Sequence, residues 1–128
     1  MSLKFNVIEK GQPGVEGGGQ KKFYAHLVFD GEVTADDLVK DIEKFSALSE
    51  PDIKGVISAL ENEIQNKLAD GKIVRLEKLG SLYPSISSNG EEKPEKVNSR
   101  SIRKVGVNFR AGTRIIKALE EAGYKKEA

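Results

Sequence analysis

The chain of 128 residues contains no cysteine and only one histidine, His26. Without cysteine it can form no disulfide and can use no thiolate as a nucleophile or metal ligand, and nothing points to secretion. The start, Met1-Ser2-Leu3-Lys4, also lacks the long apolar run of a signal peptide or a membrane span. We therefore expect a soluble protein of the cytoplasm with no membrane partner.

No group of side chains in the sequence suggests a catalytic site. His26 lies in an apolar strand without cysteine as a companion, so a packed or edge histidine is preferred over a ligand or base. Asp36 and Asp37 suit the first turn of a helix, where they complement the helix dipole, and Glu61 and Glu63 point to different faces. We predict no enzymatic activity, no metal, no cofactor and no small-molecule substrate.

Charge of both signs is abundant, but it is unevenly distributed. The 21 lysine and arginine residues nearly cancel the 20 acids. From Asp30 to Glu63, ten acids outnumber three lysines. From residue 96 to 117 there is no acid and there are seven cations, namely Lys96, Arg100, Arg103, Lys104, Arg110, Arg114 and Lys117. The asymmetry suggests a side that faces a polyanion, although charge alone favours the simpler interpretation of a solvated strand and helix.

The first thirty residues predict two strands with a glycine-rich loop between them. Alternation over residues 3–9 and an apolar run over 21–29 are typical of short strands. Residues 11–19 hold five glycines and Pro13, which indicates a turn or mobile loop. A phosphate-binding glycine loop is disfavoured, because a helix would have to follow at once. The two strands are expected to form a hairpin or to join a sheet edge.

Two helices are predicted next. Thr34 is the expected N-cap of the first, which ends near Leu48, and Ser49 is that of the second, which ends at Asp70 with Gly71 as a left-handed cap. Both carry apolar residues at three- and four-residue spacing. A helix-turn-helix that reads DNA is disfavoured, because a recognition helix between phosphates should not be so acidic.

Three strands and a third helix complete the predicted elements. The strands are expected at 73–76, from 79 onward and at 102–109, with a flexible, projecting polar loop over 89–101. Alternation in the last strand places Val105, Val107 and Phe109 on one face and Lys104, Gly106 and Asn108 on the other. The final helix follows Gly112 and ends at Gly123.

These elements and several short motifs resemble the bacterial HU/IHF histone-like family. Gly71-Lys72-Ile73-Val74-Arg75-Leu76 followed by Leu79-Gly80-Ser81-Leu82 is similar to its G-x-x-V-x-L-x-G-F-G-T-F signature, with Lys78 in place of one glycine. Phe109-Arg110-Ala111-Gly112 followed by Ile115 is similar to its F-K-P-G-x-x-L junction. Val33-Thr34 through Leu48-Ser49 is similar to the family's L-T opening. The resemblance covers roughly residues 33–122.

The resemblance implies an α+β fold of the HU/IHF type. It would have two amino-terminal helices, a three-stranded antiparallel sheet with a β-arm, and a carboxy-terminal helix, with extra amino-terminal strands. We predict one DNA-binding domain over residues 1–128, comprising a strand extension at 1–32 and an HU-like core at 33–123. The extension and the altered motifs suggest a divergent branch of the family.

The resemblance also implies a function. In that family an intertwined dimer embraces the minor groove with two β-arms and bends the DNA. We therefore predict a nucleoid-associated homodimer that binds double-stranded DNA with low sequence specificity. Its DNA-contacting residues would be cations at the return of the arm and at the saddle, namely Arg100, Arg103, Lys104, Arg110 and Arg114.

One part of the resemblance fits poorly, and it leaves an alternative open. Pro94 stands near the position of the family's intercalating proline, but acids surround it in Glu91-Glu92-Lys93-Pro94-Glu95 and would repel phosphates. The acidic loop and the near-neutral net charge favour the alternative of an HU-like dimerisation or protein-interaction module with weak or no DNA binding.

Overall fold

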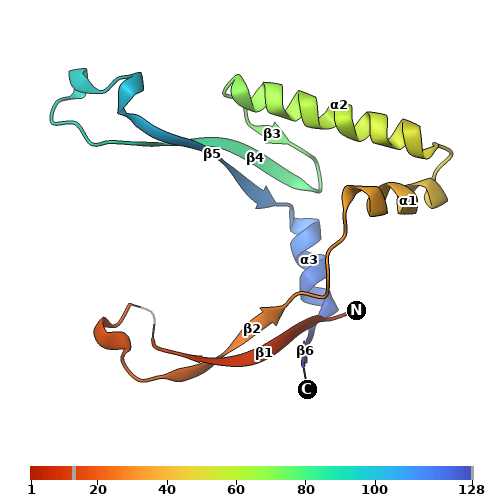
Figure 1. The fold of residues 1–128 in the computed structure, drawn as a ribbon, viewed down its shortest axis with the longest axis horizontal. Coiled ribbons are helices and arrows are strands. Elements are labelled where there is room, and N and C mark those ends of the chain that lie inside the picture. The colour runs from red at the N-terminus through yellow and green to blue at the C-terminus, as the bar shows by residue number, and fades with distance from the viewer. Residues whose placement is uncertain (13, 128) are drawn as a thin grey trace. The chain divides into compact units, whose positions relative to one another are not determined.

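A computed structural model describes residues 1–12 and 14–127, in which three α-helices and two three-stranded sheets are found (Figure 1). These residues cluster into two compact units. The first unit contains residues 1–34 and the chain from Ile116 onward, and the second contains Ala35–Ile115. Helix α3 (Thr113–Ala122) begins in the second unit and ends in the first. The predicted division at residues 1–32 and 33–123 stays a prediction.

The first unit is built around one sheet, here called the first sheet. Strands β1 (Leu3–Lys10) and β2 (Lys22–Val28) form an antiparallel hairpin, which confirms the expected pairing. A short 3₁₀ turn, η1 (Glu16–Gly18), lies in the loop between them, and Pro13 falls outside the described residues. Strand β6 (Tyr124–Lys126) runs parallel to β1 along its other edge. The strand order is therefore β2-β1-β6.

The helices of the second unit begin and end much as their capping residues predict. Helix α1 (Ala35–Phe45) starts directly after Thr34, and α2 (Glu50–Ala69) starts after Ser49. Ser49 and Asp52 form a capping box, in which each side chain accepts a hydrogen bond from the other's backbone N–H. After α2, Gly71 has a φ of 79°, and its N–H donates to the carbonyl of Leu68. The predicted left-handed cap is confirmed.

The second unit also holds the second sheet, in which β3 (Val74–Arg75), β4 (Gly80–Ser88) and β5 (Ile102–Ala111) are antiparallel in the order β3-β4-β5. The segment between β4 and β5 was predicted as a flexible loop. It contains two 3₁₀ turns, η2 (Pro94–Lys96) and η3 (Ser99–Ser101). The buried Ser101 hydroxyl donates to the Glu91 carboxylate across 2.8 Å, so this acid supports the turn locally.

The predicted HU/IHF-type architecture is wrong, although the α+β class remains. Its six strands form two three-stranded sheets rather than the single three-stranded sheet of that architecture, and the amino-terminal strands are more than the extension that was expected. The amino-terminal strands are part of a complete three-stranded sheet that also takes in β6. Sequence patterns missed β6 because a strand of three residues shows no usable alternation. Its pairing is set by a distant partner, with the Leu3 N–H donating to the Gly123 carbonyl across 2.9 Å.

Very few side chains are buried in a single chain. Among the described residues, the buried apolar side chains are Val39 on α1 and Ile53 on α2. No described residue of the first unit is buried. Large apolar side chains are exposed in both units, including Phe45 at 87% and Phe23 at 70%. Exposed apolar surface on this scale is unusual for a soluble monomer and is typical of surfaces that a partner covers.

Candidate nucleic-acid interface

The pairing of β4 with β5 sorts their side chains onto two chemically different faces. Residues directly opposite each other in an antiparallel pair share a face, and the face alternates along each strand. One face is apolar and carries Leu82, Pro84, Ile86, Val105, Val107 and Phe109. The other face is polar and carries Ser81, Tyr83, Ser85, Ser87, Lys104, Gly106, Asn108 and Arg110. The predicted faces of the last strand are thereby confirmed.

Strand β3 adds a third cation to the polar face. Arg75 lies opposite Ser81, and its Nη1 donates to the Ser81 hydroxyl at 3.4 Å and to the Tyr83 hydroxyl at 3.5 Å. The guanidinium groups of Arg75 and Arg110 lie 5.9 and 5.7 Å from the centroid of the Tyr83 ring. The ring therefore holds two guanidinium groups close together by cation–π attraction.

We call this surface, made by Arg75, Tyr83, Lys104, Asn108 and Arg110, the cationic face of the second sheet. It carries no acid within the three strands. Beside Tyr83, Asn108 and Arg110 lies a hollow of about 480 Å³ that Phe109 also lines. Guanidinium groups donate two parallel hydrogen bonds to one phosphate or carboxylate, and an amide adds further donors. The face is therefore equipped to bind an oxyanion.

The five predicted cations are not all on this face. Lys104 and Arg110 lie on it together. Arg103 lies at a bulge, where Lys104 pairs with Ser87 and Ile102 with Ser88. Alternation of faces is interrupted there. Arg100 belongs to the turn η3, and Arg114 lies in the first turn of α3. The structure thus groups two of the five predicted residues.

Sequence reasoning missed two members of the cationic face, Arg75 and Tyr83. In the sequence Arg75 stands out only as part of a family-like motif, although its alternation with Val74 places it on the face opposite the apolar side chains. The strand is only two residues long, and so short a pattern carries little weight. Tyr83 could be recognised only from its register with Asn108, which requires the pairing of distant strands.

A close backbone approach fixes the end of β5 that carries Arg110. Gly80 has a φ of 146°, and a Cβ at this position would lie 2.5 Å from the Arg110 carbonyl oxygen and 2.8 Å from the Phe109 ring. Gly112 is packed equally tightly against the Lys78 carbonyl. Both positions need glycine because no side chain fits between the two segments. The start of β4 is thereby held against the end of β5.

Other kinds of site find no support in the part of the chain that the structure describes. No three side chains of His, Asp or Glu are grouped there so as to hold a metal ion. No helix among these residues is long and apolar enough to span a membrane. Pro94 is exposed at the start of η2, directly after Lys93.

Comparisons with known proteins identify the family and the fold of the chain. A family model described as an HU domain fused to wHTH, Ig or glycine-rich motif (HU-HIG) matches residues 1–126. A crystal structure of a candidate bacterial DNA-binding protein from Bacteroides vulgatus ATCC 8482 superposes with a TM-score of 0.68 at 11% identity. The match covers 98% of this chain and 47% of that one, so this chain spans about half of its length. At that identity the likeness shows a shared fold. No curated protein matches the sequence.

Proposed function

Since the chain belongs to the HU-HIG family, we propose that it is an architectural protein that binds double-stranded DNA with little sequence preference. The observation that carries the proposal is the cationic face of the second sheet. Arg75, Lys104 and Arg110 share this face with hydroxyl and amide groups and with no acid. Such a surface matches the phosphate backbone of a duplex, which offers a dense row of single negative charges.

The chemistry of the face explains why sequence preference should be low. Phosphate contacts provide affinity through the release of condensed counterions, and they carry no information about the bases. Tyr83 keeps the guanidinium groups of Arg75 and Arg110 near each other, which reduces the conformational entropy that they lose on binding. What selectivity remains would come from the ease with which a sequence bends. A protein of this kind would act at the nucleoid in the cytoplasm.

We further propose that Arg100, Arg103 and Arg114 contact phosphates outside the cationic face. They flank it along the chain, from the turn before β5 to the first turn of α3. Arg100 is exposed, and its backbone N–H donates to the Asn98 side chain at 2.9 Å, which orients the turn that carries it. The uninterrupted absence of acids from residue 96 to 117 supports the same assignment.

The proposal includes a homodimer. A single chain buries only Val39 and Ile53 among its described apolar side chains, and the apolar face of the second sheet leaves Val105 76% exposed and Ile86 64% exposed. A second copy that covers this face would remove the apolar area from water, at roughly 25 cal/mol for each Å². Light scattering should therefore give twice the mass of one chain, and a monomer mass would contradict the dimer.

The proposed function can be tested with a labelled random-sequence duplex. Fluorescence anisotropy across a salt series should give binding that weakens steeply with salt. The variant Arg103→Ala/Lys104→Ala/Arg110→Ala should bind more weakly, and its salt slope should flatten by about 0.9 for each phosphate that the variant no longer neutralises. The matched control replaces Lys40, Lys44 and Lys67, on the acidic helices, with alanine. If the triple variant and this control bind the duplex equally well, Arg103, Lys104 and Arg110 are not part of the DNA interface.

A protein-interaction module with weak or no DNA binding is the second candidate. It is favoured by Glu91, Glu92 and Glu95 between β4 and β5, and by the large exposed apolar surface. The same measurements separate the two functions. A chain that forms a dimer in light scattering and yet binds no duplex at low salt would support the module.

A further inference from the structure

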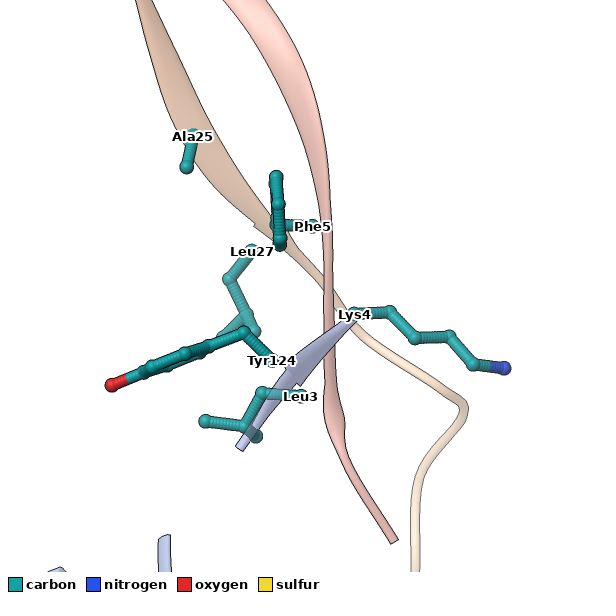
Figure 2. A pocket seen from close by; sticks show the side chains of 6 residues that line it. All are labelled: Leu3, Lys4, Phe5, Ala25, Leu27 and Tyr124. Carbon is teal, nitrogen blue, oxygen red and sulfur yellow. The ribbon is translucent and has the colours of Figure 1, made fainter. Parts of the chain in front are cut away.

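The first sheet also has two chemically different faces. Its register places apolar side chains on one face, namely Leu3, Phe5, Val7, Phe23, Ala25, Leu27 and Tyr124. The opposite face carries Lys4, Asn6, Lys10, Lys22, Tyr24, His26 and Lys125, together with the apolar Ile8 and Val28. Figure 2 shows Lys4 pointing away from the apolar side chains that line a hollow of about 540 Å³. We call the four lysines the lysine face.

The charges of this sheet are only partly segregated, because Lys126 pairs with Phe5 on the apolar face. No acid lies on the lysine face within the three strands, and the one acid of the strands, Glu9, lies on the apolar face opposite Phe23. Among the described residues, the acid that forms an ion pair with this face comes from the flanking chain. Asp30 lies 3.8 Å from the Lys4 Nζ, and Glu127 follows β6.

Two pairs of like charges face each other across the strands. Lys10 lies directly opposite Lys22, and Lys4 lies beside Lys125. Lysines 10, 22 and 125 form no ion pair with any residue that the structure describes. Like charges in directly opposed positions destabilise a sheet, whereas lysine opposite glutamate would solvate the face and stabilise it. Solvation alone therefore does not explain the three lysines that have no acidic partner, but a bound polyanion would relieve the repulsion.

The second sheet repeats this arrangement. There, Arg110 lies over the Tyr83 ring, and in the first sheet the Lys10 Nζ lies 4.9 Å from the centroid of the Tyr24 ring. Each sheet thus combines a mainly apolar face with a face that holds cations beside one tyrosine and no acid within its strands. The lysine face is chemically similar to the cationic face that we propose binds DNA.

We propose that the lysine face is a second phosphate-binding surface for duplex DNA. The proposal rests on the proposed function and extends it to the amino-terminal strands. Ammonium groups act as point charges without the directional fork of a guanidinium, so the surface would bind the backbone with little geometric selectivity. Its contribution would appear mainly as counterion release, and therefore in the salt dependence of binding.

The test variant is Lys10→Gln/Lys22→Gln/Lys125→Gln in the full chain. With a labelled random-sequence duplex between about 50 and 200 mM salt, the dissociation constant at the low-salt end should rise at least about tenfold. The salt slope should flatten by about 0.9 for each phosphate left without its lysine. The matched control, Lys40→Gln/Lys44→Gln/Lys67→Gln, changes the net charge equally and should bind like the natural chain. The variant with arginine at positions 10, 22 and 125 should retain binding, which would show that the positive charge of these side chains is responsible for it.

Failure of this inference can be told apart from failure of the proposed function. If the glutamine variant binds like its control while Arg103→Ala/Lys104→Ala/Arg110→Ala binds weakly, the lysine face is not a DNA surface and the second sheet remains one. If the natural chain binds no duplex at about 50 mM salt, both proposals fall. Circular dichroism checks folding, and Lys22→Gln alone provides a milder variant with the same direction of effect. If the glutamine variant no longer binds phosphatidylserine vesicles but still binds the duplex as tightly as the natural chain, the lysine face binds membranes instead, and the proposal is overturned.

Discussion

The charged faces of the two sheets differ in their cations: the second sheet has two arginines and Lys104, whereas the first has lysines alone. In the second sheet, Arg75 and Arg110 are held by the Tyr83 ring, so their guanidinium groups have a defined position before any ligand arrives. In the first sheet the cations are lysines, two pairs of which repel each other across the strands. A held arginine can orient a phosphate, whereas a mobile lysine mainly neutralises it. The difference suggests that the second sheet orients the duplex and the first adds affinity.

The sheets also differ in what supports them. The second sheet belongs to a unit in which Val39 and Ile53 are buried. In the first unit no described residue is buried, so its sheet relies on backbone pairing and on whatever covers its apolar face. Substitutions should therefore have their largest effects on stability in the second unit.

The largest expected effect is on this buried pair. Val39→Asp places an unpaired charge where the side chain is 1% exposed, and should lower the free energy of unfolding by about 3 kcal/mol or more. Urea denaturation measures the change. Lys40→Ala, one residue further along the same helix and exposed, should stay within about 0.5 kcal/mol of the natural chain. A denaturation midpoint unchanged by Val39→Asp would show that this buried pair is not a core.

A smaller loss is expected where β4 meets β5. Gly80→Ala introduces a Cβ against the Arg110 carbonyl at a φ that disfavours side chains, and should cost about 2 kcal/mol in thermal or urea unfolding. Gly90→Ala is the matched control, because a Cβ there meets nothing within 4 Å. The two variants should differ clearly, and equal stabilities would contradict the close approach.

The contribution of the two arginines of the second sheet to DNA binding can be measured. Arg75→Ala/Arg110→Ala should weaken duplex binding by about tenfold or more, equivalent to about 1.4 kcal/mol, because two guanidinium groups no longer bind phosphate. Tyr83→Phe keeps the ring that holds both guanidinium groups and should bind within about threefold of the natural chain. Anisotropy titrations at one fixed salt concentration suffice. Tyr83→Phe binding as weakly as the double variant would assign the role to the hydroxyl instead of the ring.

The smallest predicted change has opposite signs in two measurements. Lys22→Glu turns the repulsive pair with Lys10 into an attractive one, and should raise the free energy of unfolding by up to about 1 kcal/mol. The same variant should weaken DNA binding. Lys21→Glu changes the charge equally but has no partner in the register, so its stability should not rise. If Lys22→Glu lowers the stability instead, the two lysines do not destabilise the sheet, and their repulsion gives no reason to infer a bound polyanion.

Local features of this fold could be predicted from the sequence. The helix start at Ser49, the left-handed Gly71 and the two faces of β5 each depend on residues within one turn or one strand. The amino-terminal hairpin follows from two alternating runs and the glycines between them. In these places the local pattern alone determines the conformation.

The features that were missed depend on distant partners. Strand β6 exists because its three residues pair with Leu3, Lys4 and Phe5 near the other end of the chain. The Arg75–Tyr83–Arg110 cluster joins three strands, and the turn at Ser101 is supported by Glu91. The similarity to HU and IHF led to an architecture with one sheet, because the motifs that carried it lie almost entirely within the second unit.

The parallel pairing of β1 with β6 has a consequence for the order of folding. Because these strands come from opposite ends of the sequence, the first sheet cannot be completed until β6 has left the ribosome. Until then β1 and β2 form only a two-stranded hairpin, which is marginally stable alone and leaves its apolar face open to other chains. Among the six strands of the described residues, the first in the sequence is thus the last to be fully paired.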